Sequence, residues 1–138
     1  ADKFVALLKE KAQKMVVGCA YDPETKLGPV VNAAHKKSIC DWTQKGIDEG
    51  AELVLDGRNC VVPGYENGFF VGPTILDHVK PGMTVGDREI FGPVTCIKRC
   101  KNFEEGLAIM NERIGDFHFQ WLLCTPIRAS YRWWHGWH

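Results

Sequence analysis

Amphipathic helical segments alternate along this chain with short β-branched segments, and this alternation restricts the possible fold more than any other feature. Apolar residues recur at helical spacing from Phe4 to Met15, with lysine and glutamate on the other side. This pattern predicts a helix that ends before Gly18. Asn32 is suited to be the N-cap of a second helix, and Gly50 to be the residue that follows its last turn.

The segments between these helices have the character of strands. Residues 51–55 and 94–97 are short runs of β-branched and other apolar residues that predict strands. Residues 69–71 and 74–76, separated by a Gly-Pro break, predict an extended segment. Apolar positions over residues 103–110 predict a third helix. Strands that alternate with helices indicate an α/β fold.

The composition permits one domain and argues against two kinds of partner. With 138 residues, of which 45% are hydrophobic, the chain can bury a core of its own. The formal net charge is zero, so we expect neither nucleic acid nor a membrane as a partner. No apolar run reaches the roughly 18 residues of a spanning helix. Because the chain starts without Met and already in a helical pattern, we expect it to be an interior piece of a larger protein.

Neither disulfides nor a metal site are predicted. The six cysteines are Cys19, Cys40, Cys60, Cys96, Cys100 and Cys124, and no C-x-x-C pair occurs. This usage favours reduced cysteines in an intracellular protein. Cys96 and Cys100 lie in an alternating run and would share one face of a strand. The spacing of His118, Cys124, His135 and His138 matches no metal-binding motif.

The segment of residues 88–94, Arg-Glu-Ile-Phe-Gly-Pro-Val, contains the candidate binding residues. Glu89 stands at the entrance of a predicted strand, Phe91 follows it by two, and Gly-Pro bends the backbone between them and the strand. A carboxylate in such a place can accept two hydroxyl groups at once, which suits the vicinal diol of a ribose. A surface glutamate before an ordinary strand is the alternative interpretation.

Residues 89–94, Glu-Ile-Phe-Gly-Pro-Val, resemble a signature of the aldehyde dehydrogenase superfamily. The resemblance implies that Glu89 holds the nicotinamide ribose of NAD and that Phe91 lines the cofactor and substrate channel. Residues 27–30, 49–57 and 70–75 resemble three further segments of that family, in the same order. Residues 1–112 are therefore expected to be part of the family's catalytic domain, an incomplete α/β unit with a Rossmann-like three-layer arrangement.

Residues 62–75 and 79–84 are most similar to the methylmalonate-semialdehyde dehydrogenases. That group uses NAD and coenzyme A to convert malonate and methylmalonate semialdehydes to acetyl- and propanoyl-coenzyme A through a cysteine thioester, with loss of carbon dioxide. The full-length protein is then expected to be a homo-oligomer, a dimer or tetramer, in the cytoplasm of a bacterium or the mitochondria of a eukaryote. A succinate-semialdehyde or betaine-aldehyde branch, or a truncated product that only binds partners, are the alternatives.

Other family motifs do not occur in this chain. The family's nucleophile lies in a Gly-Gln-x-Cys motif and its second catalytic acid precedes Leu-Gly-Gly, and neither is found among the 138 residues. The Gly-rich dinucleotide-binding turn is also missing. We therefore expect the catalytic residues to lie outside this sequence, Cys96 and Cys100 to be core residues, and the chain alone to be inactive.

The resemblance stops after Asn111, and the remainder contains four of the five tryptophans. A shift of the reading frame by one base joins the last two bases of each codon with the first base of the next. In the shifted frame four tryptophans become Gly, as the family's glycine-containing turns and strands require: Trp121, Trp133, Trp134 and Trp137. In that frame residues 116–121 can read Ile-Phe-Thr-Ser-Asn-Gly, which resembles the family's next strand. Our hypothesis is that residues 113–138 are an aberrant, out-of-frame tail.

We predict that genomic DNA and transcript across codons 100–138 contain a frame break near Glu112. The shifted frame should run open into the family's remaining strand, helix and strand, and a Gly-Gln-x-Cys motif should lie upstream in the same frame as residue 1. Sequencing both nucleic acids tests this prediction. A tail confirmed in frame and followed by a stop codon would contradict it.

Overall fold

A computed structural model describes residues 1–111 of the chain. Residues 1–99 form one compact unit, and a second unit begins at Cys100. The first unit holds three helices and three strands, which are α1 (Asp2–Gln13), α2 (Ala33–Asp48), β1 (Glu52–Leu55), β2 (Thr74–Asp77), α3 (Thr84–Asp87) and β3 (Val94–Cys96). The described part of the second unit contains α4 (Phe103–Asn111).

The three strands form one mixed sheet in the order β1-β2-β3. β1 pairs antiparallel with β2, with an irregularity between Leu53 and Leu55. β2 pairs parallel with β3, and Thr74 lies opposite Val94. All four residues of β2 are buried because this strand lies in the centre of the sheet.

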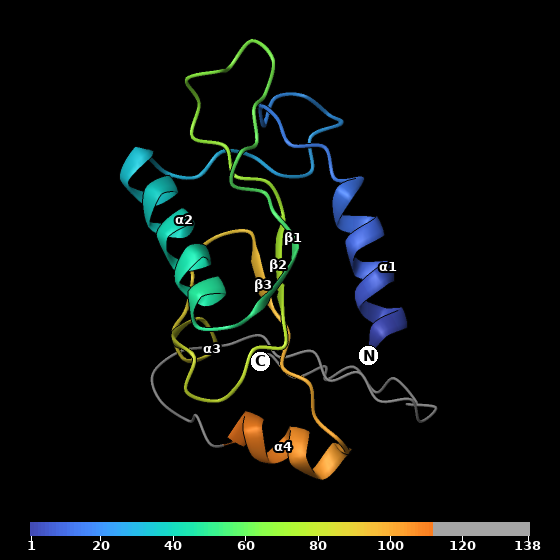
Figure 1. Ribbon diagram of the computed structural model, residues 1–138. Coiled ribbons are helices and arrows are strands. Elements are labelled where there is room, and N and C mark those ends of the chain that lie inside the picture. Colours follow the sequence, from blue (N-terminus) through green and yellow to red (C-terminus); the bar gives the residue numbers. More distant parts are fainter. Residues whose placement is uncertain (112–138) are drawn as a thin grey trace, which may run out of the picture. The chain divides into compact units, whose positions relative to one another are not determined.

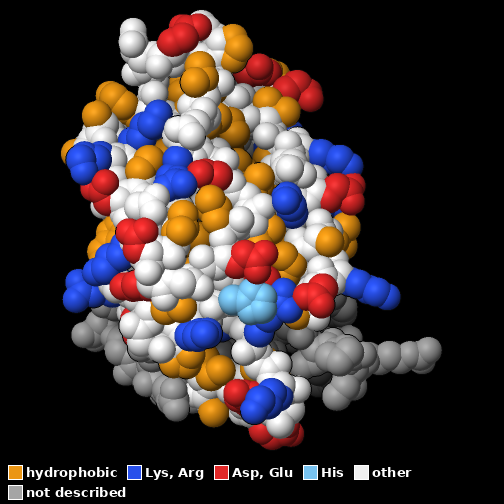
Figure 2. Space-filling model, in the orientation of Figure 1, with side chains coloured by type: hydrophobic (Ala, Val, Ile, Leu, Met, Phe, Trp, Pro, Cys, Tyr) orange, Lys and Arg blue, Asp and Glu red, His pale blue; other side chains and the backbone are white. Residues whose placement is uncertain are grey.

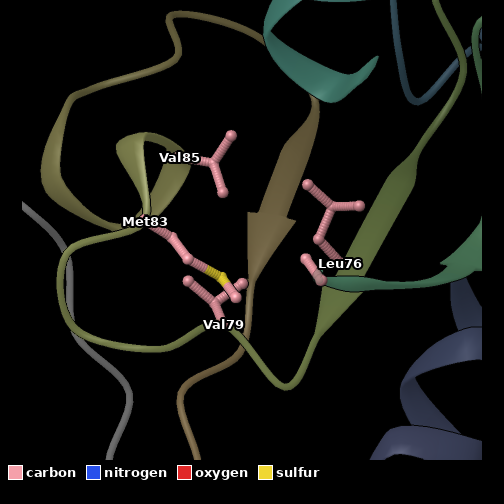
Figure 3. Close-up of a cluster of buried hydrophobic side chains, with 5 residues drawn as sticks. Leu76, Val79, Met83 and Val85 are labelled. Carbon is pink, nitrogen blue, oxygen red and sulfur yellow. The ribbon is translucent and has the colours of Figure 1, made fainter. Parts of the chain in front are cut away.

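Helices lie on both sides of this sheet. α2 runs along one side of the strands and α1 along the other, which gives the first unit three layers (Figure 1). This arrangement agrees with the predicted α/β catalytic-domain fold. The main buried cluster lies where β2, α3 and the start of β1 meet, and its members are Ala51, Leu76, Val79, Met83 and Val85. The labelled side chains of this cluster point toward one another (Figure 3).

A glycine lets α2 approach the sheet and α3 closely. A Cβ atom on Gly46 would lie 2.8 Å from Cγ1 of Val85 and 3.0 Å from Cδ1 of Leu76. Both neighbours are buried and cannot move away easily. Any larger residue at position 46 would therefore push α2 off the core.

A buried carboxylate at the end of β2 is paired with an arginine that follows β3. Asp77 accepts hydrogen bonds from Nε and Nη2 of Arg99 at 3.1 and 2.7 Å, and Nη1 of Arg99 lies 2.6 Å from Asp2 of α1. Burial raises the pKa of Asp77, but hydrogen bonds from Arg99 and from the backbone N–H of His78, with the charge of Arg99, hold it below the usual value. The pair thus compensates the desolvation of Asp77 and joins α1 to the sheet.

The helix signals in the sequence are confirmed. Asn32 is the N-cap of α2, and its side chain accepts a hydrogen bond from the backbone N–H of His35. Gly50 follows α2 with a φ of 102°, in the left-handed region that favours glycine. The third predicted helix corresponds to α4.

The strand predictions were partly wrong. Of the extended segment expected over residues 69–76, only the part after the Gly-Pro break is a strand, and this strand runs from Thr74 to Asp77. β3 ends at Cys96 rather than continuing through residue 97. Cys100 lies beyond β3, so Cys96 and Cys100 do not share one strand as expected. The short helix α3 was not predicted, because four residues are too few to show a periodic pattern.

Features of the described residues that bear on possible partners are the charge of the surface, the length of the helices and the grouping of metal ligands. Basic and acidic side chains are interspersed over the face in Figure 2. No described helix has the length and apolar character needed to cross a bilayer. No group of three or more potential metal ligands occurs within residues 1–111. Positions 118, 124, 135 and 138, considered above, lie outside the described residues.

Candidate cofactor-binding loop

The predicted site residues lie on the loop that joins α3 to β3. Glu89 and Phe91 are both exposed, and 75% of Phe91 is accessible to solvent. Ile90 between them is half-buried and packs against the core cluster. This alternation places one apolar anchor inward and leaves the carboxylate and the aromatic ring at the surface.

The carboxylate of Glu89 is available for a ligand. In the part of the chain that the structure describes, it accepts no hydrogen bond and forms no ion pair. An exposed carboxylate offers two oxygens as acceptors, so it can bind two neighbouring hydroxyl groups. The arrangement fits the diol that the sequence motif predicts.

Helix α2 contacts the loop at two neighbouring positions. A Cβ atom on Gly92 would lie 2.5 Å from Cδ1 and 2.9 Å from Cγ1 of Ile39, which is 1% exposed. One helical turn earlier, Nε2 of His35 lies 2.5 Å from the carbonyl oxygen of Phe91. Glycine is therefore required at position 92 because the loop backbone passes directly over α2.

The C-terminal end of α2 fixes the start of α3. The carboxylate of Glu49 accepts hydrogen bonds from the backbone N–H of Thr84, at 2.6 Å, and from the Thr84 hydroxyl. The backbone N–H of Arg88 in turn donates to the carbonyl of Thr84 at 3.0 Å. Helix α2 thus restrains α3, and through α3 the point at which the loop begins.

The end of the loop is tied to the sheet. The N–H of Gly92 donates to the carbonyl of Ile90, and the N–H of Val94 donates to the carbonyl of Gly92, each at 2.8 Å. The carbonyl of Pro93 accepts from the N–H of Thr74 at 2.8 Å. The first two bonds fix the Gly-Pro bend, and the third joins the loop to β2 where the parallel β2–β3 ladder begins.

An apolar groove opens beside the loop. It has a volume of about 430 Å³ and lies between α1 and the first residues of β2 and β3. Gly92 and Pro93 of the loop contribute to its lining, together with Leu8 and Met15 of α1. No local sequence pattern predicts this groove, since it depends on the position of α1 relative to the strands.

The described cysteines form no disulfide, and Cys96 does not have the character of a nucleophile. All five, Cys19, Cys40, Cys60, Cys96 and Cys100, are free and half-buried. Burial raises the pKa of the Cys96 thiol to about 11, although the charge of Lys98 acts in the opposite direction. A thiol with such a pKa stays protonated near neutral pH, as expected for a core cysteine.

Comparison with known proteins identifies the class to which this arrangement belongs. The model of the aldehyde dehydrogenase family matches residues 1–114. The chain therefore belongs to the aldehyde dehydrogenase family. Among curated proteins it is similar to the acylating, mitochondrial methylmalonate-semialdehyde dehydrogenase of Arabidopsis thaliana, with 47% identity over 105 residues. The match covers 76% of this chain but only 17% of that protein.

Solved structures agree with this assignment. The methylmalonate-semialdehyde dehydrogenase of Oceanimonas doudoroffii superposes with a TM-score of 0.75 at 37% identity, over 78% of this chain and 22% of that one. An aldehyde dehydrogenase of Mycobacterium tuberculosis, solved with NAD+, superposes with a TM-score of 0.74 at 35% identity, over 80% and 23%. This chain thus spans about a fifth of the length of these relatives.

The contact between Gly92 and Ile39 predicts the effect of a single methyl group. Gly92→Ala should lower the free energy of unfolding by about 1–3 kcal/mol, because the added Cβ overlaps a buried side chain. Gly28→Ala is the matched control, since no atom lies within 4 Å of a Cβ built there. Urea unfolding of the chain and both variants measures the difference. Equal stability of the two variants would show that α2 does not press on the loop.

Proposed function

We propose that this chain is part of an NAD-dependent oxidoreductase that oxidises malonate and methylmalonate semialdehydes and releases acetyl- or propanoyl-coenzyme A. The observation that carries the proposal is the exposed Glu89 carboxylate on a loop restrained by α2 and by the β2–β3 ladder. The choice of substrate is supported by the 47% identity to the Arabidopsis thaliana enzyme, whose name specifies the acylating reaction.

The residues of the loop fit the ribose end of NAD. Glu89 presents to solvent two acceptor oxygens that have no partner among the described residues, and Phe91 presents an apolar ring two residues further on. Glu89 would hold the two hydroxyl groups of the nicotinamide ribose, and Phe91 would pack beside the reacting end of the cofactor. When bound, NAD accepts a hydride from the substrate carbon.

The task of these residues is to orient rather than to react. Hydride transfer requires the donor and acceptor carbons to be held in close contact, so a small displacement of the ribose has a large effect on rate. A loop that is fixed by backbone hydrogen bonds on both sides suits this task better than a mobile one. Glu89 and Phe91 are thus proposed as binding residues, not as the nucleophile or the acid.

The remaining chemistry is assigned to segments beyond these 138 residues. The Gly-Gln-x-Cys motif does not occur here, and Cys96 is a protonated core thiol. A cysteine from another segment would form the thioester that passes the acyl group to coenzyme A. The isolated chain is accordingly proposed to be inactive, and the intact protein to be a homo-oligomer. The family match ends at residue 114, which supports an aberrant origin for residues 113–138.

A chimeric enzyme allows Glu89 to be tested. In this chimera, residues 1–112 replace the matching segment of the Oceanimonas doudoroffii enzyme. Glu89→Gln should slow single-turnover NADH formation from methylmalonate semialdehyde by roughly ten- to hundredfold, because an amide holds the ribose less well than a carboxylate. NADH absorbance in a stopped-flow instrument measures the rate.

Glu24→Gln, a change of the same kind at an exposed position in the loop before α2, serves as the control. It should leave the rate unchanged. If Glu89→Gln and Glu24→Gln form NADH at the same rate as the parent chimera, Glu89 does not position the cofactor and the proposed site is wrong.

A further inference from the structure

We propose that His35 is a positioning residue that holds the Glu89–Phe91 loop in the orientation in which it receives the cofactor. The inference rests on the proposed function, because it concerns the same loop. It adds a residue from α2, which is separated from Phe91 by 56 positions in the sequence. His35 would act through the loop backbone and not by touching the cofactor.

The first support is the contact itself. Nε2 of His35 lies 2.5 Å from the carbonyl oxygen of Phe91. Since a carbonyl oxygen can only accept, Nε2 carries the proton and donates it in this hydrogen bond. The two rings also lie near each other, with centroids 6.5 Å apart and planes inclined by 33°. The imidazole therefore restrains both the peptide group and the side chain of Phe91.

The second support is the rigidity of the donor. The backbone N–H of His35 donates to Oδ1 of Asn32 at 2.8 Å, which is the N-cap bond of α2. His35 thus sits in the first turn of a capped, 16-residue helix whose Ile39 is buried against Gly92. The backbone of His35 is therefore held in place relative to the core, which limits the positions that its side chain can take.

The third support is that the other hydrogen bonds of the loop run between backbone groups, so His35 adds the restraint from a side chain of α2. Among the described residues, the bond from His35 is the only one that a side chain makes to the backbone of residues 88–93. The peptide groups that flank it belong to Ile90, which packs inward, and Gly92, which touches α2. The His35 bond therefore fixes the carbonyl of the residue whose ring borders the proposed cofactor site.

Three variants separate positioning from general stability. His35→Leu removes the donor. His35→Gln keeps an amide N–H at a similar distance from the helix, so it should restore the bond. Lys37→Leu introduces the same leucine on the same helix about 200° away, at a side chain that is 75% exposed.

Hydrogen exchange of the full 138-residue chain without NAD reports on the loop directly. In His35→Leu, amides of residues 88–92 should exchange about two- to tenfold faster, as expected for the loss of one hydrogen bond. Amides of α2 and β2 should keep their rates. His35→Gln and Lys37→Leu should match the parent chain throughout. In the chimera, His35→Leu should weaken NAD binding by a similar factor, measured by titration calorimetry, and His35→Gln should not.

Each contrary result has a distinct meaning. Unchanged loop exchange in His35→Leu would overturn the role of His35 and leave the proposed function to the Glu89 test. Faster exchange in all three variants would mean that the change reflects helix stability, which also overturns the inference. Faster loop exchange with unchanged NAD affinity would show that the loop is held by His35 but does not form the cofactor site, which contradicts the proposed function as well.

Discussion

The contact between the buried side chain of Ile39 and the backbone of Gly92 is the constraint on which the candidate site depends. It brings the α3–β3 loop onto helix α2 without room for a single additional carbon atom. Gly46 provides a second close approach on the same helix, toward Val85 of α3 and Leu76 of β2. Because interiors are close-packed, two such contacts fix the position of α2 relative to both ends of the loop.

Two carboxylates near the sheet, those of Asp77 and Glu89, differ in burial and in pairing. Asp77 is buried and satisfied by Arg99 and by the N–H of His78, so its charge stabilises the fold and is not free for a ligand. Glu89 is exposed, and within residues 1–111 no group pairs with its carboxylate. The proposed role of Glu89 in binding a ribose follows from this difference in burial and pairing rather than from its charge alone.

The sequence was informative where a few neighbouring residues determine the structure. The N-cap at Asn32 and the left-handed Gly50 depend on local backbone chemistry, and both were predicted correctly. The Glu-Ile-Phe-Gly-Pro-Val segment and three further segments in the same order identified the family, and the family model confirms this assignment over residues 1–114.

Features that depend on distant residues could not be predicted in the same way. The alternating pattern continues past Cys96, but the last pair of the parallel ladder is Leu76 with Cys96, and the length of the ladder depends on the partner strand β2 as much as on β3. Nothing in the local sequence around His35 indicates that it lies beside Phe91, since the contact exists only after α2 has packed on the loop. The roles of Glu89 and Phe91 in binding remain predictions.

A crystal structure of the chimera with NAD bound would test the proposal that the loop held by α2 presents Glu89 to the ribose of NAD. The two carboxylate oxygens of Glu89 should lie within about 3 Å of the two hydroxyl groups of the nicotinamide ribose. The hydrogen bond from His35 to the Phe91 carbonyl should be retained. A ribose bound by other residues, with Glu89 facing solvent, would show that the proposed site is wrong.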